Sequence, residues 1–270
     1  MDTLFPFLYD GWRNAIPVGV AAAAGYGKGG CFRSLCLMLS GTTDCDEQGS
    51  EQYNRGGGFM NPLLKGLEHL GHAAVRMAGD RTIYVDPFQI DRNYLDADVI
   101  FITHSHHDHF SPEDIRRVKK AETVLVLPSD CEFLAAELGW HNTLTVSAGM
   151  SEVAAGVSFT AVPAYNIGKS FHAQNRCWLG YIILFNGNRI YVSGDTDVIP
   201  EMAQHACDVA FLPVGGTYTM TALEAVEAVR LIKPKVAVPT HYGAVIGSQL
   251  DAQTFLSHLP AGVEGALLHG

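Results

Sequence analysis

The feature that most constrains this chain is a cluster of metal-binding side chains placed directly after an apolar segment. The segment Asp98–Ile102 contains β-branched and aromatic residues without a helical period, which predicts a buried strand. Four histidines and one aspartate lie within the six positions 104–109. Imidazole and carboxylate groups are ligands for Zn, Mn or Fe, and a strand end holds such side chains on a rigid scaffold. Rather than a solvated histidine-rich loop, we expect a turn that brings four ligands to metal: His104, His106, Asp108 and His109.

The order His-x-His-x-Asp-His in this turn resembles the signature of the metallo-β-lactamase superfamily. The resemblance extends from about Leu67 to the C-terminus. It implies an α/β (α+β) fold, a four-layer αββα sandwich in which two β-sheets pack face to face between outer helices. It also implies one or two metals at the sheet edge. Because proteins that share such a fold catalyse many different reactions, the signature does not name a substrate.

The resemblance also places later site residues. Asp195, in Ser-Gly-Asp-Thr-Asp, matches the aspartate that bridges two metals, and His241, in Pro-Thr-His-Tyr-Gly, matches the last metal ligand. His72 and Asp86 match positions beneath the site, where Asp86 would orient the histidine loop by hydrogen bonding. A buried histidine that only satisfies its own hydrogen bonds is an equally open interpretation of His72.

One segment departs from the family pattern. The family places a metal-binding histidine after the strand that corresponds to Val157–Val162, but the matching position holds Asn166 and the nearest histidine is His172. We favour Asn166 as a weak ligand through its carbonyl oxygen, with His172 as the alternative. The same loop carries Lys169 and Arg176, which could hold an anionic substrate group or could simply be solvated.

Apolar patterning predicts a first half in which strands and helices alternate, followed by further strands and helices. Leu67–Met77 is expected to form the first strand of a hairpin, and Val263–Leu268 the closing strand. Thr221–Ile232 has helical spacing, so four of its apolar residues should face the core: Leu223, Val226, Val229 and Ile232. The polar loop before this helix, residues 215–220, should lie at the rim of the site, where we assign two residues to substrate binding: Thr217 and Tyr218.

Residues 1–59 differ in character from the rest of the chain. They contain alanine and glycine runs without sustained periodicity, which predicts a poorly ordered N-terminal appendage to a domain spanning residues 60–270. Its three cysteines, Cys31, Cys36 and Cys45, are expected to be unpaired. The apolar run Ile16–Ala24 is not preceded by a positively charged segment, which argues against a signal peptide.

The composition excludes several classes of partner. The chain has 28 acidic and 18 basic residues and a net charge of −10 at pH 7, which argues against binding to nucleic acid. No uninterrupted apolar run reaches the roughly 18 residues that a membrane helix needs. Six cysteines without a Cys-x-x-Cys pair favour a reduced, cytoplasmic protein. We expect a small-molecule substrate, and a homo-oligomer is compatible with the sequence.

The resemblance implies a metal-dependent hydrolase that attacks its substrate with metal-activated water. One or two divalent metals, Zn or Mn, are expected, with Asp195 between two sets of ligands: His104 and His106 on one side, and Asp108, His109 and His241 on the other. Asp108 or Asp195 would act catalytically by orienting the water and moving its proton. The motifs are most similar to the branch containing L-ascorbate-6-phosphate lactonase and N-acyl-phosphatidylethanolamine phospholipase D, which implies an ester, lactone or phosphodiester substrate. Two alternatives stay open, a regulatory relative with a degenerate metal site and a di-iron oxidoreductase that would need a flavin domain or partner.

Overall fold

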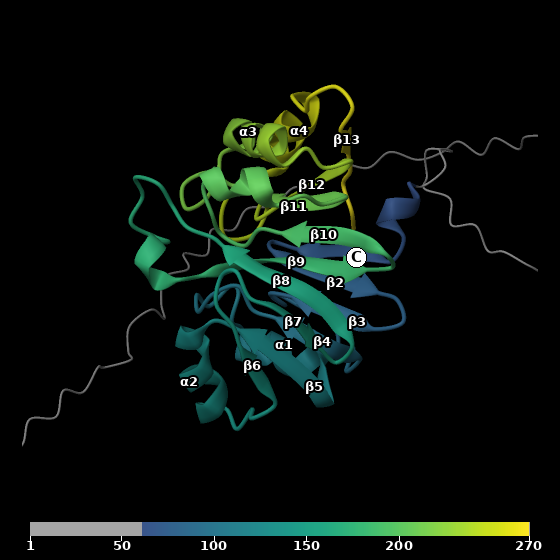
Figure 1. Cartoon of the computed structure of the whole chain (residues 1–270), viewed down its shortest axis with the longest axis vertical. Coiled ribbons are helices and arrows are strands. Elements are labelled where there is room, and N and C mark those ends of the chain that lie inside the picture. The colour runs from purple at the N-terminus through teal and green to yellow at the C-terminus, as the bar shows by residue number, and fades with distance from the viewer. Residues whose placement is uncertain (1–60, 270) are drawn as a thin grey trace, which may run out of the picture. The chain divides into compact units, whose positions relative to one another are not determined.

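The first of two β-sheets occupies the N-terminal half of the part of the chain that the computed structural model describes, residues 61–269 (Figure 1). Its six strands lie in sequence order, from β1 to β6. They are β1 (Leu67–Gly71), β2 (Ala74–Ala78), β3 (Thr82–Val85), β4 (Ala97–Phe101), β5 (Lys119–Leu127) and β6 (Thr143–Thr145). β1, β2 and β3 pair antiparallel, whereas the neighbours from β3 to β6 are parallel.

The second sheet contains seven strands, also arranged in sequence order from β7 at one edge to β13 at the other. They are β7 (Ser151–Ala154), β8 (Val157–Pro163), β9 (Leu179–Phe185), β10 (Asn188–Val192), β11 (Val209–Pro213), β12 (Val236–Thr240) and β13 (Glu264–Gly265). The pairs from β7 to β10 are antiparallel, and those from β10 to β13 are parallel. Parallel strands place their carboxyl ends at the same edge of a sheet, which is where ligand-binding loops collect.

Helices cover the outer faces of both sheets. They are α1 (Pro112–Val118), α2 (Ser129–Glu137), α3 (Ala222–Ile232) and α4 (Gln249–Ser257), with short 3₁₀ turns at Pro62–Leu64, Gln174–Arg176 and Pro200–Gln204. The first two helices contact β5 and β6, and the last two contact β11 and β12, so the sheets lie between the two helical layers (Figure 1). The four-layer αββα sandwich predicted from the sequence is confirmed.

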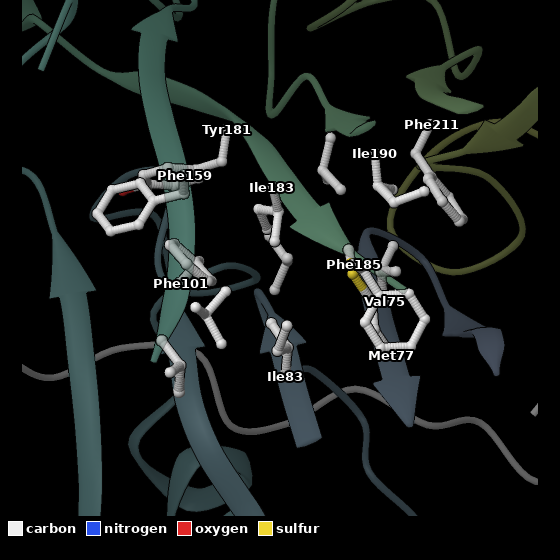
Figure 2. Packing of buried hydrophobic residues seen from close by; sticks show 14 of the residues in the cluster. Val75, Met77, Ile83, Phe101, Phe159, Tyr181, Ile183, Phe185, Ile190 and Phe211 are labelled. Atoms are coloured by element: carbon white, nitrogen blue, oxygen red, sulfur yellow. The ribbon is translucent and has the colours of Figure 1, made fainter. Parts of the chain in front are cut away.

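The core between the sheets follows from the alternation of side chains along each strand. In β4, Val99 and Phe101 point into the space between the sheets, whereas Ile100 packs in the layer of α1 and α2. The rings of Phe159 and Tyr181 each lie 4.9 Å from the Phe101 ring, centroid to centroid (Figure 2). This packing holds β4 against β8 and β9, the strands whose ends lead into the site described below.

Three expectations about the elements are wrong. The segment Leu67–Met77 is not one strand, because a turn at His72 and Ala73 divides it into β1 and β2. Leu223 is 54% exposed, because the buried residues of α3 cover an arc of the helix that does not include position 223. The C-terminal strand is limited to Glu264–Gly265, and β7, which the sequence analysis missed, adds an edge strand to the second sheet.

The predicted N-terminal appendage, residues 1–59 with Cys31, Cys36 and Cys45, lies outside the described residues. Between residues 61 and 269, Cys131, Cys177 and Cys207 are free thiols. In the same range no helix combines the length and the apolar character needed to cross a membrane.

Candidate metal centre

Loops from both sheets bring imidazole and carboxylate groups together at one edge of the sandwich. From the first sheet, the β1–β2 turn supplies His72 and the loop after β4 supplies residues 104–109. From the second sheet, the loops after β8, β10 and β12 supply His172, Asp195 and His241. Residues more than 100 positions apart in the chain therefore meet only because the two sheets pack face to face.

The Asp195 carboxylate lies at the centre of this arrangement and is 4% exposed. Its oxygens lie 3.4 Å from Nε2 of His109, 3.1 Å from Nε2 of His172 and 3.2 Å from Nε2 of His241. A fourth nitrogen, Nε2 of His104, lies 4.0 Å away. The Asp195 carboxylate thus faces four histidines that come from three loops, those after β4, β8 and β12.

The remaining donors form two groups, in each of which all candidate ligand atoms lie within 4.8 Å of one another. The inner group consists of His72, Asp108, His109 and His241, all of them buried. The outer group consists of His104, His106 and His172, of which His106 is partly exposed. The side chain of His107 is 81% exposed and belongs to neither group.

The donor set fits a divalent metal. Nε2 of His109, His172 and His241 is buried without a hydrogen-bond partner among residues 61–269. Buried polar atoms are rarely left unpaired in folded proteins, and an unpaired atom calls for an explanation such as a bound ion. Here the unpaired nitrogens face Asp195, and imidazole with carboxylate and no thiolate is a ligand set suited to Zn, Mn or Fe.

Asp86 holds the inner group from below. One carboxylate oxygen accepts the backbone N–H of Thr103 at 2.8 Å, and the other accepts the Thr103 hydroxyl at 2.6 Å. The second oxygen also lies 2.7 Å from Nδ1 of His109, so the ring donates there and keeps Nε2 directed at the site. The Thr103 hydroxyl in turn lies 3.0 Å from Nδ1 of His104. Asp86 therefore occupies the orienting position that the resemblance implied, through a threonine to which the sequence analysis gave no role.

Three of the site residues have left-handed backbone conformations, which are uncommon for residues other than glycine. The φ angles are 47° at His72, 45° at Asp86 and 56° at His241. The His241 N–H donates to the carbonyl of His72 at 2.6 Å, which ties the two sheets together at this point. Gly215 is required beside them, because a Cβ atom there would lie 2.3 Å from the carbonyl oxygen of His241. Strained backbone of this kind is often found at functional sites.

His72 takes a more direct place than the sequence suggested. Its Nε2 lies 2.9 Å from Oδ2 of Asp108, and its ring lies 4.0 Å from that of His241, centroid to centroid, with the ring planes tilted by 43°. It therefore lies within the inner donor group and is not isolated in the core.

The preference for Asn166 as the missing ligand is not supported by the geometry, which places His172 there. The Asn166 side-chain oxygen lies 3.0 Å from the backbone nitrogen of His172, which donates to it, and 3.1 Å from Nδ1 of the same ring. The Asn166 amide nitrogen donates to the carbonyl of Tyr218 at 3.0 Å. With both ends of its amide engaged, Asn166 fixes the His172 ring so that Nε2 faces Asp195. Matching positions along the sequence favoured Asn166, because the sequence does not show that the loop folds back and brings His172 beside Asp195.

The loop that carries His172 is tied to its surroundings by Lys169. The Lys169 ammonium donates to Asp197 and to the carbonyl of Thr219, both at 2.6 Å, and Asp197 also accepts the Ile167 N–H at 2.8 Å. Asp197 therefore anchors this loop. The lysine expected to bind substrate is a structural partner of the same carboxylate.

Of the other three residues expected to bind substrate, Tyr218 lies at the mouth of the site, whereas Thr217 and Arg176 are exposed to solvent. Tyr218 lies at the mouth of the site against Phe171, with a centroid distance of 4.7 Å. Thr217 is exposed. Arg176 is also exposed, and its guanidinium lies 5.9 Å from the centre of the Trp178 ring.

Trp178 is a site residue that sequence reasoning missed. Its ring lies 4.7 Å from those of His104 and His106, centroid to centroid, and forms an apolar wall behind the outer group. Its indole N–H donates to Asp130 at 2.7 Å, and Asp130 also accepts the Ser105 hydroxyl at 2.7 Å. The only signal in the sequence was a tryptophan directly before an apolar strand, which is also what an ordinary core residue gives.

The pKa values of the ligands His104 and His106 in the outer group are shifted in the opposite direction from that of His109 in the inner group. Burial, reinforced by the neighbouring His109, lowers the pKa of His104 well below its usual value, and burial also lowers the pKa of His106. Burial opposes charge on His109 too, but the carboxylates of Asp195 and Asp86 raise the pKa of His109 well above its usual value. Burial of Asp195 is similarly outweighed by His241 and His109, which lower its pKa well below the usual range.

Comparison with known proteins agrees with this geometry. Residues 66–241 match the family model described as a β-lactamase superfamily domain. A UPF0173 metal-dependent hydrolase from Thermococcus onnurineus is 35% identical over 204 residues, which are 70% of this chain and 89% of the relative. One from Geobacillus thermodenitrificans is 34% identical over 224 residues, 76% of this chain and 97% of the relative.

A solved structure shows the same relationship. The crystal structure of a protein described as a metal-dependent hydrolase from Parabacteroides distasonis is 31% identical and superimposes with a TM-score of 0.65. The alignment covers 75% of this chain and 91% of that one. With the sandwich fold and the histidine–aspartate cluster, these matches show that the chain belongs to the UPF0173 metal-dependent hydrolases of the metallo-β-lactamase superfamily.

Proposed function

We propose that the protein hydrolyses a small ester, lactone or phosphodiester at one or two divalent metals, with Zn and Mn as the first candidates. The observation that carries this proposal is the position of Asp195, whose carboxylate faces four histidines from three separate loops. Such metals, when bound, polarise the bond to be cleaved and make water a nucleophile near neutral pH. The branch of the superfamily that contains lactonases and a phospholipase D is the most similar in motif style.

Each ligand group would hold one metal. The outer group supplies three imidazoles, from His104, His106 and His172, and the inner group supplies Asp108 with further imidazoles from His109 and His241. Asp195 contributes its two oxygens between them. Both Asp108 and Asp195 line the pocket described below, so either carboxylate can accept the proton that water loses during attack.

A nucleophile from the protein is not needed. Of the thiols between residues 61 and 269, Cys131 is buried and its pKa is raised by that burial, which keeps it protonated and unreactive. Water is therefore the nucleophile that the site can offer.

The grounds for a degenerate, regulatory relative are weaker than the sequence implied. That alternative rested on Asn166 standing where the family has a histidine, whereas the His172 imidazole lies in the outer donor group, 3.1 Å from Asp195. We also propose a cytoplasmic location, since the described cysteines are free thiols, as expected in a reducing compartment.

The test is metal content per chain together with hydrolysis of a p-nitrophenyl ester and of bis(p-nitrophenyl) phosphate, in wild type and in Asp195→Asn. We expect bound metal and turnover in the wild type, and loss of both in the variant, because one carboxylate serves both groups. Asp208→Asn is the matched control, since Asp208 pairs with Lys235 at the start of β11, away from the site. Full hydrolysis by Asp195→Asn would contradict the proposed function.

A further inference from the structure

The metal ligands form the floor of an open pocket of about 240 Å³. Its lining combines ligands with three residues that have apolar surfaces, Phe171, Tyr218 and Val245. These three come from three different loops, those after β8, β11 and β12. Any substrate that reaches Asp195 must therefore pass and contact this apolar rim.

The rim leaves hydrophobic surface exposed where substrate would enter. Phe171 is 46% exposed and Val245 is 41% exposed. The edge of the Phe171 ring packs on Tyr218, with a centroid distance of 4.7 Å and an interplanar angle of 83°. Single exposed apolar residues are common on protein surfaces. Two exposed apolar side chains at the mouth of one pocket, however, form a surface on which an apolar group can pack.

Among residues 61–269, no lysine or arginine lines this pocket. The two nearby cations that could have held an anionic substrate are placed elsewhere. The Lys169 ammonium is bound by Asp197 and the Thr219 carbonyl, and Arg176 lies over Trp178 outside the lining. Metals held by the ligands would attract the scissile group itself, but the described rim offers no cation to a second anionic group elsewhere on the substrate.

We infer that the site takes an uncharged ester or lactone whose apolar group packs against Phe171, Tyr218 and Val245. This inference rests on the proposed function and narrows it, because it assigns the part of the substrate remote from the scissile bond to the apolar rim and disfavours a carboxylate there. In the reaction, the water oxygen bonds to the carbonyl carbon and the bond from that carbon to the alkoxy oxygen breaks. One proton from water passes to the departing oxygen, which leaves an acid and an alcohol.

The first measurement compares p-nitrophenyl acetate, butyrate and hemisuccinate, which share one leaving group, with bis(p-nitrophenyl) phosphate. Each methylene buried on the rim should raise kcat/KM about fourfold, so butyrate, with two more methylenes, should exceed acetate by about fifteenfold. The hemisuccinate ester, which adds a carboxylate to a chain of similar length, should fall at least about tenfold below butyrate after its spontaneous cleavage is subtracted. Equal or faster enzymatic turnover of the hemisuccinate, or turnover of the phosphodiester alone, would overturn the inference.

Variants then locate the preference on the rim. Phe171→Ser and Val245→Ser should each bring the butyrate-to-acetate ratio towards one. Phe133→Ser and Val153→Ser are matched controls, because these residues are 67% and 62% exposed on α2 and β7, away from the pocket. A ratio unchanged in both rim variants would show that the apolar rim does not select the substrate.

A binding measurement separates this inference from the proposed function. If neither the esters nor the phosphodiester is hydrolysed above the Asp195→Asn background, the proposed function fails. The rim is then judged by equilibrium dialysis of the p-nitroanilides of butyrate and hemisuccinate. Tighter binding of the butyrate anilide, weakened by Phe171→Ser, supports the uncharged apolar ligand, and equal or reversed affinities refute it.

Discussion

The inner and outer groups of the metal centre are built in different ways, although they share Asp195. The inner group is fully buried and held by strand ends, by Asp86 and by strained backbone at His72 and His241. The outer group lies against Trp178, and one of its three ligands, His172, reaches the site on a long loop. The comparison teaches that the inner ligands are positioned by the fold itself. Of the outer ligands, His104 and His106 share the turn after β4 with the inner group, so the difference lies in His172, which depends on side-chain contacts made within and around its own loop.

The largest expected effect comes from removing one histidine of each group. His109→Ala should lose the inner metal and reduce hydrolysis by more than the about 10- to 100-fold typical of losing an orienting partner. His172→Ala should leave the inner metal bound and lose the outer one. Metal content by mass spectrometry checks this, with circular dichroism to show that both variants remain folded. If both variants retained the same metal, the division into two groups would not hold.

A smaller effect is expected when the supports are changed and the ligands are kept. Asp86→Asn replaces the carboxylate that accepts from His109 and Thr103, and should weaken metal binding at the inner group by about 10- to 100-fold. Asn166→Leu removes one of two acceptors near Nδ1 of His172, the other being the Tyr218 carbonyl at 3.1 Å, and should weaken only the outer group, by about 10-fold. Competition with a chromogenic chelator measures both affinities. An Asn166→Leu variant with unchanged outer affinity would show that the loop holds His172 without this amide.

The smallest effect distinguishes the groups without any mutation. The raised pKa of His109 means that its ring is protonated at neutral pH, so a metal entering the inner group should displace about one proton. The lowered pKa values of His104 and His106 mean that these rings are already neutral, so neither should release a proton to a metal. Inner affinity should therefore rise more steeply with pH through the neutral range than outer affinity. Calorimetry in two buffers of different ionisation enthalpy counts the protons, and equal release from both metals would contradict the assignment.

The resemblance carried by the histidine turn was sufficient for the sandwich and for part of the site. The turn after β4 was predictable because all its ligands lie within one short loop behind an apolar strand. Asp195 and His241 could be assigned because each stands in a motif that matches the family. Position along the chain was not sufficient for His172, since a loop that folds back can place a ligand six residues beyond the matching position. The roles of Thr103 and Trp178 could not be inferred from the sequence, because these roles depend on contacts with residues that are distant in the chain.

Ligands from the two sheets lie within a few ångströms of one another, and this affects the stability of the whole domain. The loop after β4 and the loops after β10 and β12 close one end of the sandwich, so an ion held between them acts as a reversible cross-link between the sheets. By mass action, a metal at about 100 times its dissociation constant adds about 2.7 kcal/mol to the free energy of unfolding. The resistance of this protein to heat should therefore follow the free metal concentration around it, as well as the packing of Phe101 and its neighbours.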